Sequence, residues 1–292
     1  MDCDAPGCGS RAIIIELPSV TGSAIALLPS PASPASAVHI WRLRLDPDTS
    51  TVAMLGRSLS ADEHDRAERC RHPDDVRRFR VARGALRALI ARYLETDPAA
   101  IQFEYGPHGK PALARDSAVI DLQFNLSHSG DVALVAFCVG CPLGVDLEHA
   151  ERSVDALALA GRYGSPRECA MLQALDAGQR PRRFIELWTC KEAWLKAAGL
   201  GIGAGLAALE IELGTGRPCI SRLPSAGGDI DHWSIALLEP EDGFVAAIVL
   251  HDPVHELGEM VERGVATVAA ALVGEHMTIA IQPRPVARWA PL

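Results

Sequence analysis

The chain has 292 residues, of which 48% are hydrophobic and 22% charged, and its formal net charge is −9. This is the composition of a globular protein with enough apolar residues for one large core or two smaller ones. The negative charge argues against non-specific nucleic-acid binding as the main function, and apolar runs such as 265–273 are too short to span a bilayer. The acidic N-terminus lacks a basic region, so we expect no secretory signal and a cytoplasmic protein that does not bind membranes.

Residues 1–37 contain a run rich in Pro, Ala and Ser and show no apolar period, so we expect a poorly ordered arm. Apolar alternation and helical periodicity then predict the elements of a first unit. These are a strand at 38–45, a short helix opened by the capping box Ser60–Glu63, a longer helix near 74–95, and strands at 101–105, 123–127 and 131–139.

The same kind of pattern then starts again. It predicts a strand at 142–150, helices near 153–163, 166–176 and 182–198, strands at 209–213, 232–240 and 244–251, and an amphipathic helix at 254–273. The order of strand, helices and strands therefore occurs twice, which predicts an α+β protein of two similar halves. The expected divisions are the arm 1–37, a first half 38–141, a second half 142–252 and a C-terminal helical extension 253–292.

The predicted helix that contains LWTCKEAWLKAAGLG, residues 187–201, carries charges beside its apolar stripe. Lys191 interrupts or borders that stripe, while Glu192 and Lys196 are four residues apart on a shared flank. A Glu–Lys pair at this spacing is by itself typical of a solvated helix surface. Lys191 either reaches a phosphate or anchors the helix.

The segment GVDLE, residues 144–148, places two carboxylates on one face of a strand. Asp146 and Glu148 share that face, and Val145 and Leu147 occupy the other. A solvated outer face is one interpretation of this pattern. The alternative is a cation site, because carboxylate oxygens beside substrate phosphates suit Mg²⁺, and Glu192 could add a third oxygen.

Two further segments present polar groups in predicted turns. FNLSHSG, residues 124–130, offers a hydroxyl, an imidazole and backbone donors, but no G-x-S-x-G elbow of a serine hydrolase. It is also compatible with a turn that holds a hydrogen-bonded histidine. GPHGKP, residues 106–111, is a loop that presents Lys110 to an anion or is merely a turn.

Arginine and cysteine each show one notable pattern. The arginine run fits either phosphate binding by one or two members or a solvated helix face balanced by acidic neighbours, and it comprises Arg66, Arg69, Arg71, Arg77, Arg78, Arg80, Arg83, Arg87 and Arg92. Cys138 and Cys141 form C-x-x-C, but no second pair lies at zinc-site spacing. A small buried residue is the simpler interpretation of Cys138 than a metal or redox role.

The segments GKP, FNLSHSG, GVDLE and WTCKEAWLK follow one another at separations that resemble the 4′-phosphopantetheinyl transferases of the Sfp type. The signatures of that family are a G-V/I-D-x-E strand and a W-x-x-K-E-x-x-x-K helix, and the resemblance covers about residues 38–252. It implies a monomer of two α+β halves related by a pseudo-twofold axis, with the active site at the seam. It also implies transfer of the phosphopantetheine arm of coenzyme A to a serine of an apo acyl- or peptidyl-carrier protein, with release of 3′,5′-ADP.

The resemblance assigns roles by position. It implies Mg²⁺, or Mn²⁺, held by Asp146, Glu148 and Glu192, with Lys196 beside the pyrophosphate and Glu192 or a water as the base for the serine proton. The residues that resemble coenzyme A contacts are Arg66, Arg78, Gly109, Lys110, Ser127 and His128, and the catalytic set is Glu192, Lys196 and His128.

Two other classes of function compete with this one. The first is another magnesium-dependent enzyme that acts on a nucleotide pyrophosphate, such as a nucleotidyl transferase. The second is a catalytically silent module that binds carrier proteins. The absence of P-loop and G-x-G-x-x-G motifs argues against the commonest nucleotide-binding folds, and the complete set of Asp146, Glu148, Glu192 and Lys196 argues against a silent module.

Overall fold

The computed structural model of the chain describes residues 14–16, 37–114, 120–201, 203, 205–214, 218–252 and 274–280. Its strands form two main sheets and two small ribbons. The first sheet has the order β1 (Ile14–Glu16), β12 (Gly274–Ala280), β2 (Ala37–Arg44), β6 (Val132–Val139) and β5 (Leu122–Ser129). The second has the order β10 (Trp233–Leu238), β11 (Phe244–His251) and β7 (Leu143–His149). The ribbons pair β3 (Phe103–Tyr105) with β4 (Pro111–Leu113), and β8 (Glu210–Leu213) with β9 (Pro218–Arg222).

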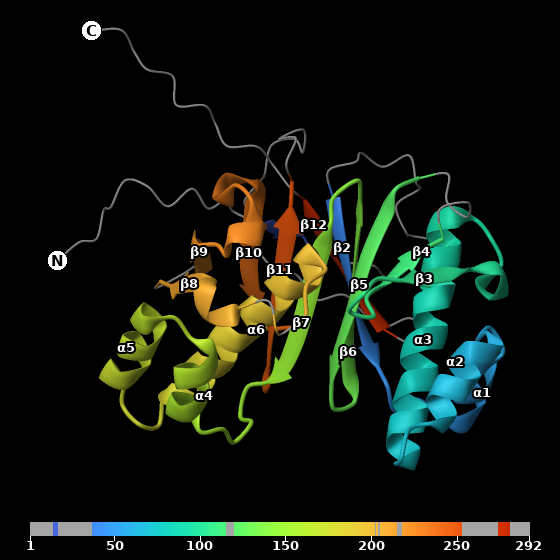
Figure 1. Cartoon of the computed structure of the whole chain (residues 1–292). Coiled ribbons are helices and arrows are strands. Elements are labelled where there is room, and N and C mark those ends of the chain that lie inside the picture. Colours follow the sequence, from blue (N-terminus) through green and yellow to red (C-terminus); the bar gives the residue numbers. More distant parts are fainter. Residues whose placement is uncertain are drawn as a thin grey trace, which may run out of the picture.

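The sheets pack face to face between two groups of helices (Figure 1). One outer layer holds α1 (Thr49–Gly56), α2 (Ala61–Glu68) and α3 (Pro73–Leu94); the other holds α4 (Ala156–Tyr163), α5 (Pro166–Ala174) and α6 (Arg180–Ala198). Short 3₁₀ turns lie at Pro98–Ala100, Leu206–Ala208, Ser225–Gly227 and Ile230–His232. The expected mixture of helices and sheets is confirmed, while a pseudo-twofold relation between two halves stays a prediction.

The layers enclose three clusters of buried apolar side chains. In β6, alternate side chains point to opposite faces: Leu134 packs toward the second sheet, and Val135 packs toward α3. In β7, Val145 and Leu147 lie in the core between the sheets and are at most 1% exposed. The predicted alternation of GVDLE is therefore confirmed, and the side chains of Asp146 and Glu148 lie on the opposite face, toward α6.

Local sequence signals explain where the helices begin and end. The predicted capping box of Ser60 and Glu63 opens α2, and a second one, Ser165 with Glu168, opens α5. Pro73 occupies the first turn of α3, where its missing N–H costs no hydrogen bond. At the end of α6, Gly199 adopts φ 68°, a left-handed conformation that favours glycine.

Helix α6 approaches β7 very closely because residue 144 has no side chain. A Cβ at Gly144 would lie 2.1 Å from the carbonyl oxygen of Ala193 and 2.3 Å from the backbone nitrogen of Ala197. This glycine thus brings α6, with Glu192 and Lys196, against the strand that carries Asp146. The glycine of GVDLE is therefore required by the packing of α6 against β7.

The terminal extensions contain two strands that the sequence analysis did not predict. β12 pairs antiparallel with β2 from Gly274–Leu43 to Ala280–Ala37, and β1 pairs with the outer side of β12. The arm assigned to 1–37 thus contains β1 and the first residue of β2, and the extension assigned to 253–292 contains a strand. The helix predicted at 254–273 lies outside the described residues.

Candidate active site

The centre of the site is a cluster of three polar side chains between β5, β7 and α6. The ammonium of Lys196 lies 2.6 Å from Asp146 Oδ1 and 2.9 Å from Ser127 Oγ. The Ser127 hydroxyl in turn donates to the same Asp146 oxygen at 2.9 Å. The structure therefore brings together three of the predicted residues, one from each of three elements far apart in the sequence.

Glu192 lies one helical turn before Lys196 and is half-buried. Burial raises the pKa of its carboxyl, and the nearby charges of Asp146 and Glu148 raise it further, while Lys196 lowers it. Burial and Asp146 likewise raise the pKa of Glu148, whose carboxylate is 3.2 Å from the guanidinium of Arg152. Three mutually repelling carboxylates around one lysine form a site with excess negative charge.

Two carboxylate oxygens in this site lack a hydrogen-bond partner although they are buried, Asp146 Oδ2 and Glu192 Oε1. Buried anionic oxygens without partners are costly unless a cation completes them. Among the described residues, however, no three His, Cys, Asp or Glu side chains are arranged to hold a metal ion as they stand. The oxygen donors thus fit the chemistry of a Mg²⁺ site, and a shared metal ligand set of Asp146, Glu148 and Glu192 stays a prediction.

His128 and Arg78 lie beside this cluster, at the end of β5 and in the first half of α3. Loss of hydration lowers the pKa of His128, and the charges of Lys196 and Arg78 lower it further. Arg78 itself is held by Asp131, at 2.9 Å, and by Asp75, at 3.1 Å. The cationic groups near the carboxylates are therefore Arg78 and Lys196, which suit a substrate with several phosphates, while the lowered pKa of His128 favours its neutral form.

The loop between β3 and β4 reaches the seam through Lys110. Its ammonium donates to the carbonyl of Leu143 at 2.9 Å and to the carbonyl of Lys196 at 2.6 Å, and burial lowers its pKa to about 8. Gly109 forms the turn before it with φ 79°. The two carbonyls engage Lys110 in the structure, and its predicted contact with coenzyme A stays a prediction.

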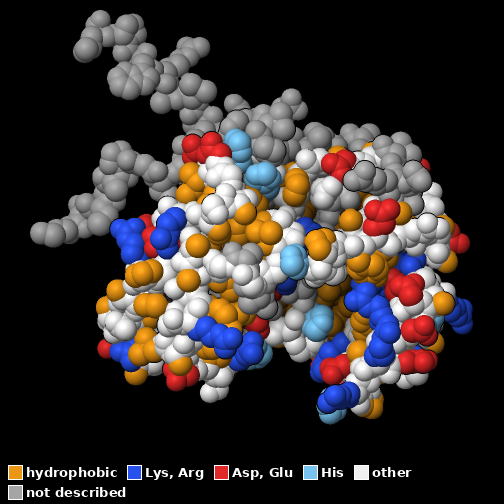
Figure 2. Space-filling model, in the orientation of Figure 1, with side chains coloured by type: hydrophobic (Ala, Val, Ile, Leu, Met, Phe, Trp, Pro, Cys, Tyr) orange, Lys and Arg blue, Asp and Glu red, His pale blue; other side chains and the backbone are white. Residues whose placement is uncertain are grey.

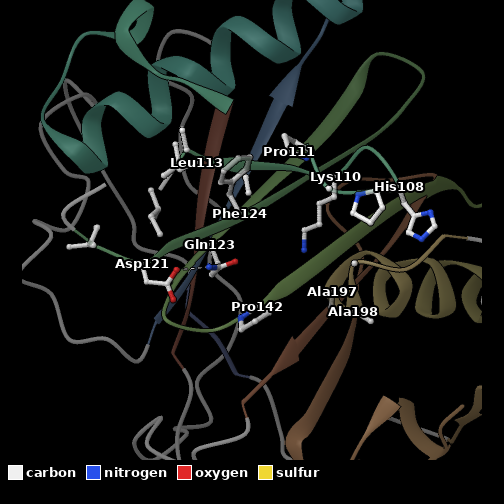
Figure 3. Close-up of a pocket in the computed structure, with 17 residues that line it drawn as sticks. His108, Lys110, Pro111, Leu113, Asp121, Gln123, Phe124, Pro142, Ala197 and Ala198 are labelled. Carbon is white, nitrogen blue, oxygen red and sulfur yellow. Dashed lines mark hydrogen bonds between the residues drawn. The ribbon is translucent and has the colours of Figure 1, made fainter. Parts of the chain in front are cut away.

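Lys110 also lines a cavity of about 640 Å³. Figure 3 shows its walls, which come from the β3–β4 loop, the beginning of β5, Pro142 and the end of α6. Phe124 and Leu113 provide apolar surface, and Gln123 donates to Asp121 at its rim. Of the predicted site residues, Lys110 is the one that lines this cavity.

The arginine run divides into members with different partners, and Figure 2 shows basic side chains gathered over α2 and α3. Arg87 is fully buried and is paired with Glu63 at 2.7 Å, so it is structural. The guanidinium of Arg66 lies 4.9 Å from the ring centre of Tyr105. Arg83 lies 5.0 Å from the ring of Phe103, and its Nη1 is buried without a partner. Arg83 is also paired with Glu63 at 3.5 Å, so it is a second, partly paired candidate for anion binding within the arginine run.

Lys191 and the cysteines have structural roles. Lys191 is 3% exposed, pairs with Glu168 at 2.7 Å and donates to the carbonyls of Leu206 and Leu209. Of the two alternatives for this lysine, anchoring of the helix is the one that the structure supports. Cys138 and Cys141 are buried free thiols, which agrees with the simpler interpretation of the C-x-x-C pair.

Comparison with protein families decides the class of this molecule. The model of the 4′-phosphopantetheinyl transferase superfamily matches residues 142–249, and the model of the N-terminal part of a 4′-phosphopantetheinyl transferase matches residues 44–139. The 4′-phosphopantetheinyl transferase HetI of Nostoc sp. is 40% identical over 213 residues, which are 73% of this chain and 87% of HetI. The chain belongs to the 4′-phosphopantetheinyl transferase superfamily. It is therefore an enzyme that transfers a group, and the suspected family is confirmed.

Two further matches have lower sequence identity to this chain. The 4′-phosphopantetheinyl transferase Sfp of Bacillus subtilis is 30% identical over 171 residues, which are 54% of this chain and 74% of Sfp. Among solved structures, the holo-[acyl-carrier-protein] synthase of Thermotoga maritima covers 42% of this chain and 78% of its own, at 23% identity and a TM-score of 0.32. The family assignment rests on the sequence relatives. In the part of this transferase that the structure describes, no helix is long and apolar enough to cross a membrane.

Proposed function

We propose that this transferase moves the 4′-phosphopantetheine arm of coenzyme A to a serine hydroxyl of an apo acyl- or peptidyl-carrier protein, with Mg²⁺ or Mn²⁺ as cofactor. The observation that carries the proposal is the cluster of Lys196, Asp146 and Ser127, with Glu192 beside it, in a chain of this family. This cluster offers both a cation for phosphate oxygens and carboxylates for a metal ion. A monomer, without nucleic-acid or membrane partners, is sufficient for this reaction.

The chemistry is a displacement at the β-phosphorus of coenzyme A. A bond forms from the serine oxygen of the carrier to that phosphorus, and the bond from phosphorus to the bridging oxygen breaks. The electron pair of the broken bond leaves with 3′,5′-ADP, and the serine proton passes to Glu192, directly or through a water. Glu192 lies close to Asp146 and Lys196, so its carboxylate is placed to accept that proton.

The residues of the cluster divide this work. Lys196, whose side chain is 28% exposed, can offer its ammonium to phosphate oxygens and stabilise their growing charge. Asp146, Glu148 and Glu192 would hold the metal ion, which when bound polarises the attacked phosphate and offsets charge on the leaving group. His128 and Arg78 would contact the phosphates from the β5 side, and Ser127 would orient Lys196.

Mass spectrometry of a carrier protein tests this proposal. Incubation of the enzyme with coenzyme A, magnesium and an apo-carrier should increase the carrier mass by one phosphopantetheine per molecule. Asp146→Ala should remove that increase while the protein keeps its fold, because Val145 and Leu147 carry the burial of β7. A nucleotidyl adduct would indicate the rival transferase, and binding of the carrier without any adduct would indicate the silent module. Undiminished turnover of Asp146→Ala would contradict the metal assignment.

A further inference from the structure

Strand β7 has an open edge toward the active site. It is the last strand of its sheet among the described residues, and its other edge pairs with β11. The carbonyl of Pro142 accepts from the backbone nitrogen of His251 at 2.9 Å, on the β11 side. Since successive residues of an antiparallel strand direct their polar groups to alternate sides, Leu143 and Val145 direct theirs away from β11, toward β5.

Side chains rather than a neighbouring strand satisfy this open edge. Lys110 donates to the carbonyl of Leu143 at 2.9 Å. The side-chain oxygen of Asn125 accepts from the backbone N–H of Val145 at 2.9 Å, and Lys196 donates to the carbonyl of Val145 at 3.2 Å. Three polar backbone groups on this edge are thus bonded by side chains from the β3–β4 loop, β5 and α6.

This arrangement keeps β5 and β7 side by side without a ladder between them. A backbone ladder would set the strands about 4.8 Å apart. An asparagine side chain inserted between two backbones requires a wider separation, because the carbons of the side chain add to the length of the link. Asn125 therefore helps to set the distance between β5 and β7 at the seam, which is the space between these two strands that contains Ser127 and Asp146.

We propose that Asn125 is a positioning residue for the transfer reaction, an inference that rests on the function proposed above. Asn125 is 5% exposed, and it lies two residues before Ser127 on the same face of β5. Its partner Val145 directly precedes Asp146. The bond between Asn125 and Val145 therefore fixes the register in which Ser127 meets Asp146 at 2.9 Å and both meet Lys196. Asn125 touches no reacting atom and acts through this register.

The test compares two substitutions of similar volume. Asn125→Leu removes the acceptor and keeps the size, so kcat should fall roughly tenfold or more while the dissociation constant for coenzyme A changes less than about threefold. Gln123→Leu is the matched control, since Gln123 lies on the same face of β5 and donates to Asp121 instead of β7. This control should keep kcat within about twofold of wild type. Asn125→Asp retains an oxygen acceptor and should exceed Asn125→Leu in kcat.

Amide hydrogen exchange gives a readout that is independent of activity. Protection of the Val145 amide should fall at least tenfold in Asn125→Leu and recover in Asn125→Asp, while Ile248 on β11 stays protected. A purely structural role would instead lower the thermal midpoint and leave kcat of the folded enzyme unchanged, which would overturn the proposal. If Asn125→Leu does not fold, Asn125→Ala replaces it with the same expected order of effects. A wild-type enzyme that modifies no carrier would refute the proposed function. Hydrogen exchange at Val145 would still decide whether Asn125 fixes β7 against β5.

Discussion

Glu192 combines an unfavourable contribution to stability with the role proposed for it in the reaction. Its Oε1 is buried without a partner, and burial, followed by the charges of Asp146 and Glu148, raises its pKa. A carboxyl whose pKa is higher in the folded than in the unfolded chain binds more protons when folded. Its ionisation therefore reduces the free energy of unfolding as pH rises through the unfolded and then the folded pKa.

Glu192→Gln should separate transfer from binding and from stability. Glutamine keeps the shape but removes the charge and the basicity, so transfer should fall roughly a hundredfold or more. Coenzyme A and magnesium should still bind in calorimetric titrations, because Asp146 and Glu148 remain. The thermal midpoint at pH 7 should equal or exceed that of wild type, and the wild-type decrease of kcat at acidic pH should disappear. Near-normal transfer by this variant would contradict a role of Glu192 in the reaction and leave it only an ionic neighbour of Lys196.

Arg78 and Arg83 are the two candidates for binding the 3′-phosphate of coenzyme A. Arg78 is paired with Asp75 and Asp131, and Arg83 is paired with Glu63 at 3.5 Å, although the buried Nη1 of Arg83 has no hydrogen-bond partner. We expect Arg78→Ala to raise the Michaelis constant for coenzyme A roughly tenfold and to remove the preference over the dephospho form, as loss of one charge-assisted contact of ~1.5–3 kcal/mol implies. If Arg78→Ala keeps that preference and Arg83→Ala loses it, Arg83 binds the 3′-phosphate instead.

At the scale of elements, the contact between α6 and β7 depends on Gly144. A methyl group there would overlap backbone atoms of Ala193 and Ala197, which cannot move without shifting the helix. Gly144→Ala should therefore destabilise the protein by about 1–3 kcal/mol or more and displace Lys196 from Asp146. Urea unfolding and transfer rates measure both effects. The control is Gly161→Ala in α4, where a Cβ meets open space and where alanine should stabilise the helix by about 0.5–1 kcal/mol. Equal effects of the two substitutions would contradict this account.

The sequence predicted the elements that carry a strong local signal. The alternation of GVDLE and the capping box of α2 depend on neighbouring residues, and both were found as expected. Helix α1 has only 8 residues and no clear apolar period, so it was missed. The bond from Asn125 to Val145 joins a side chain to the backbone of another sheet. No local pattern encodes such a contact, because it exists only after the two sheets have packed.

At the scale of the whole molecule, the two terminal extensions differ in what they contribute to the first sheet. β12 pairs with residues 37–43 of β2, whereas β1 adds 3 residues to the outside of β12. Neither strand reaches the β5–β7 seam. Removal of either extension should therefore leave the chemistry intact in the folded protein, with different effects on stability.

Deletion of residues 1–35 should leave transfer and thermal stability nearly unchanged. Deletion of residues 253–292 should uncover the edge of β2, lower the thermal midpoint and promote self-association, because an unpaired edge accepts strands from other chains. Transfer assays, thermal unfolding and light scattering compare the two truncated proteins. A well-folded but inactive protein after the first deletion, or a monodisperse protein of wild-type stability after the second, would be contrary to this expectation.

The pairing of Leu43 with Gly274 also has a consequence during protein synthesis. β2 is synthesised early, β5 and β6 follow, and then the second sheet. The strand that lies beside β2, β12, is the last of the described strands. At about 5–20 residues per second, β2 waits roughly 10–50 s for this partner. During that interval nascent chains on one messenger carry identical open strands a short distance apart, so slower initiation of translation should increase the yield of correctly folded enzyme.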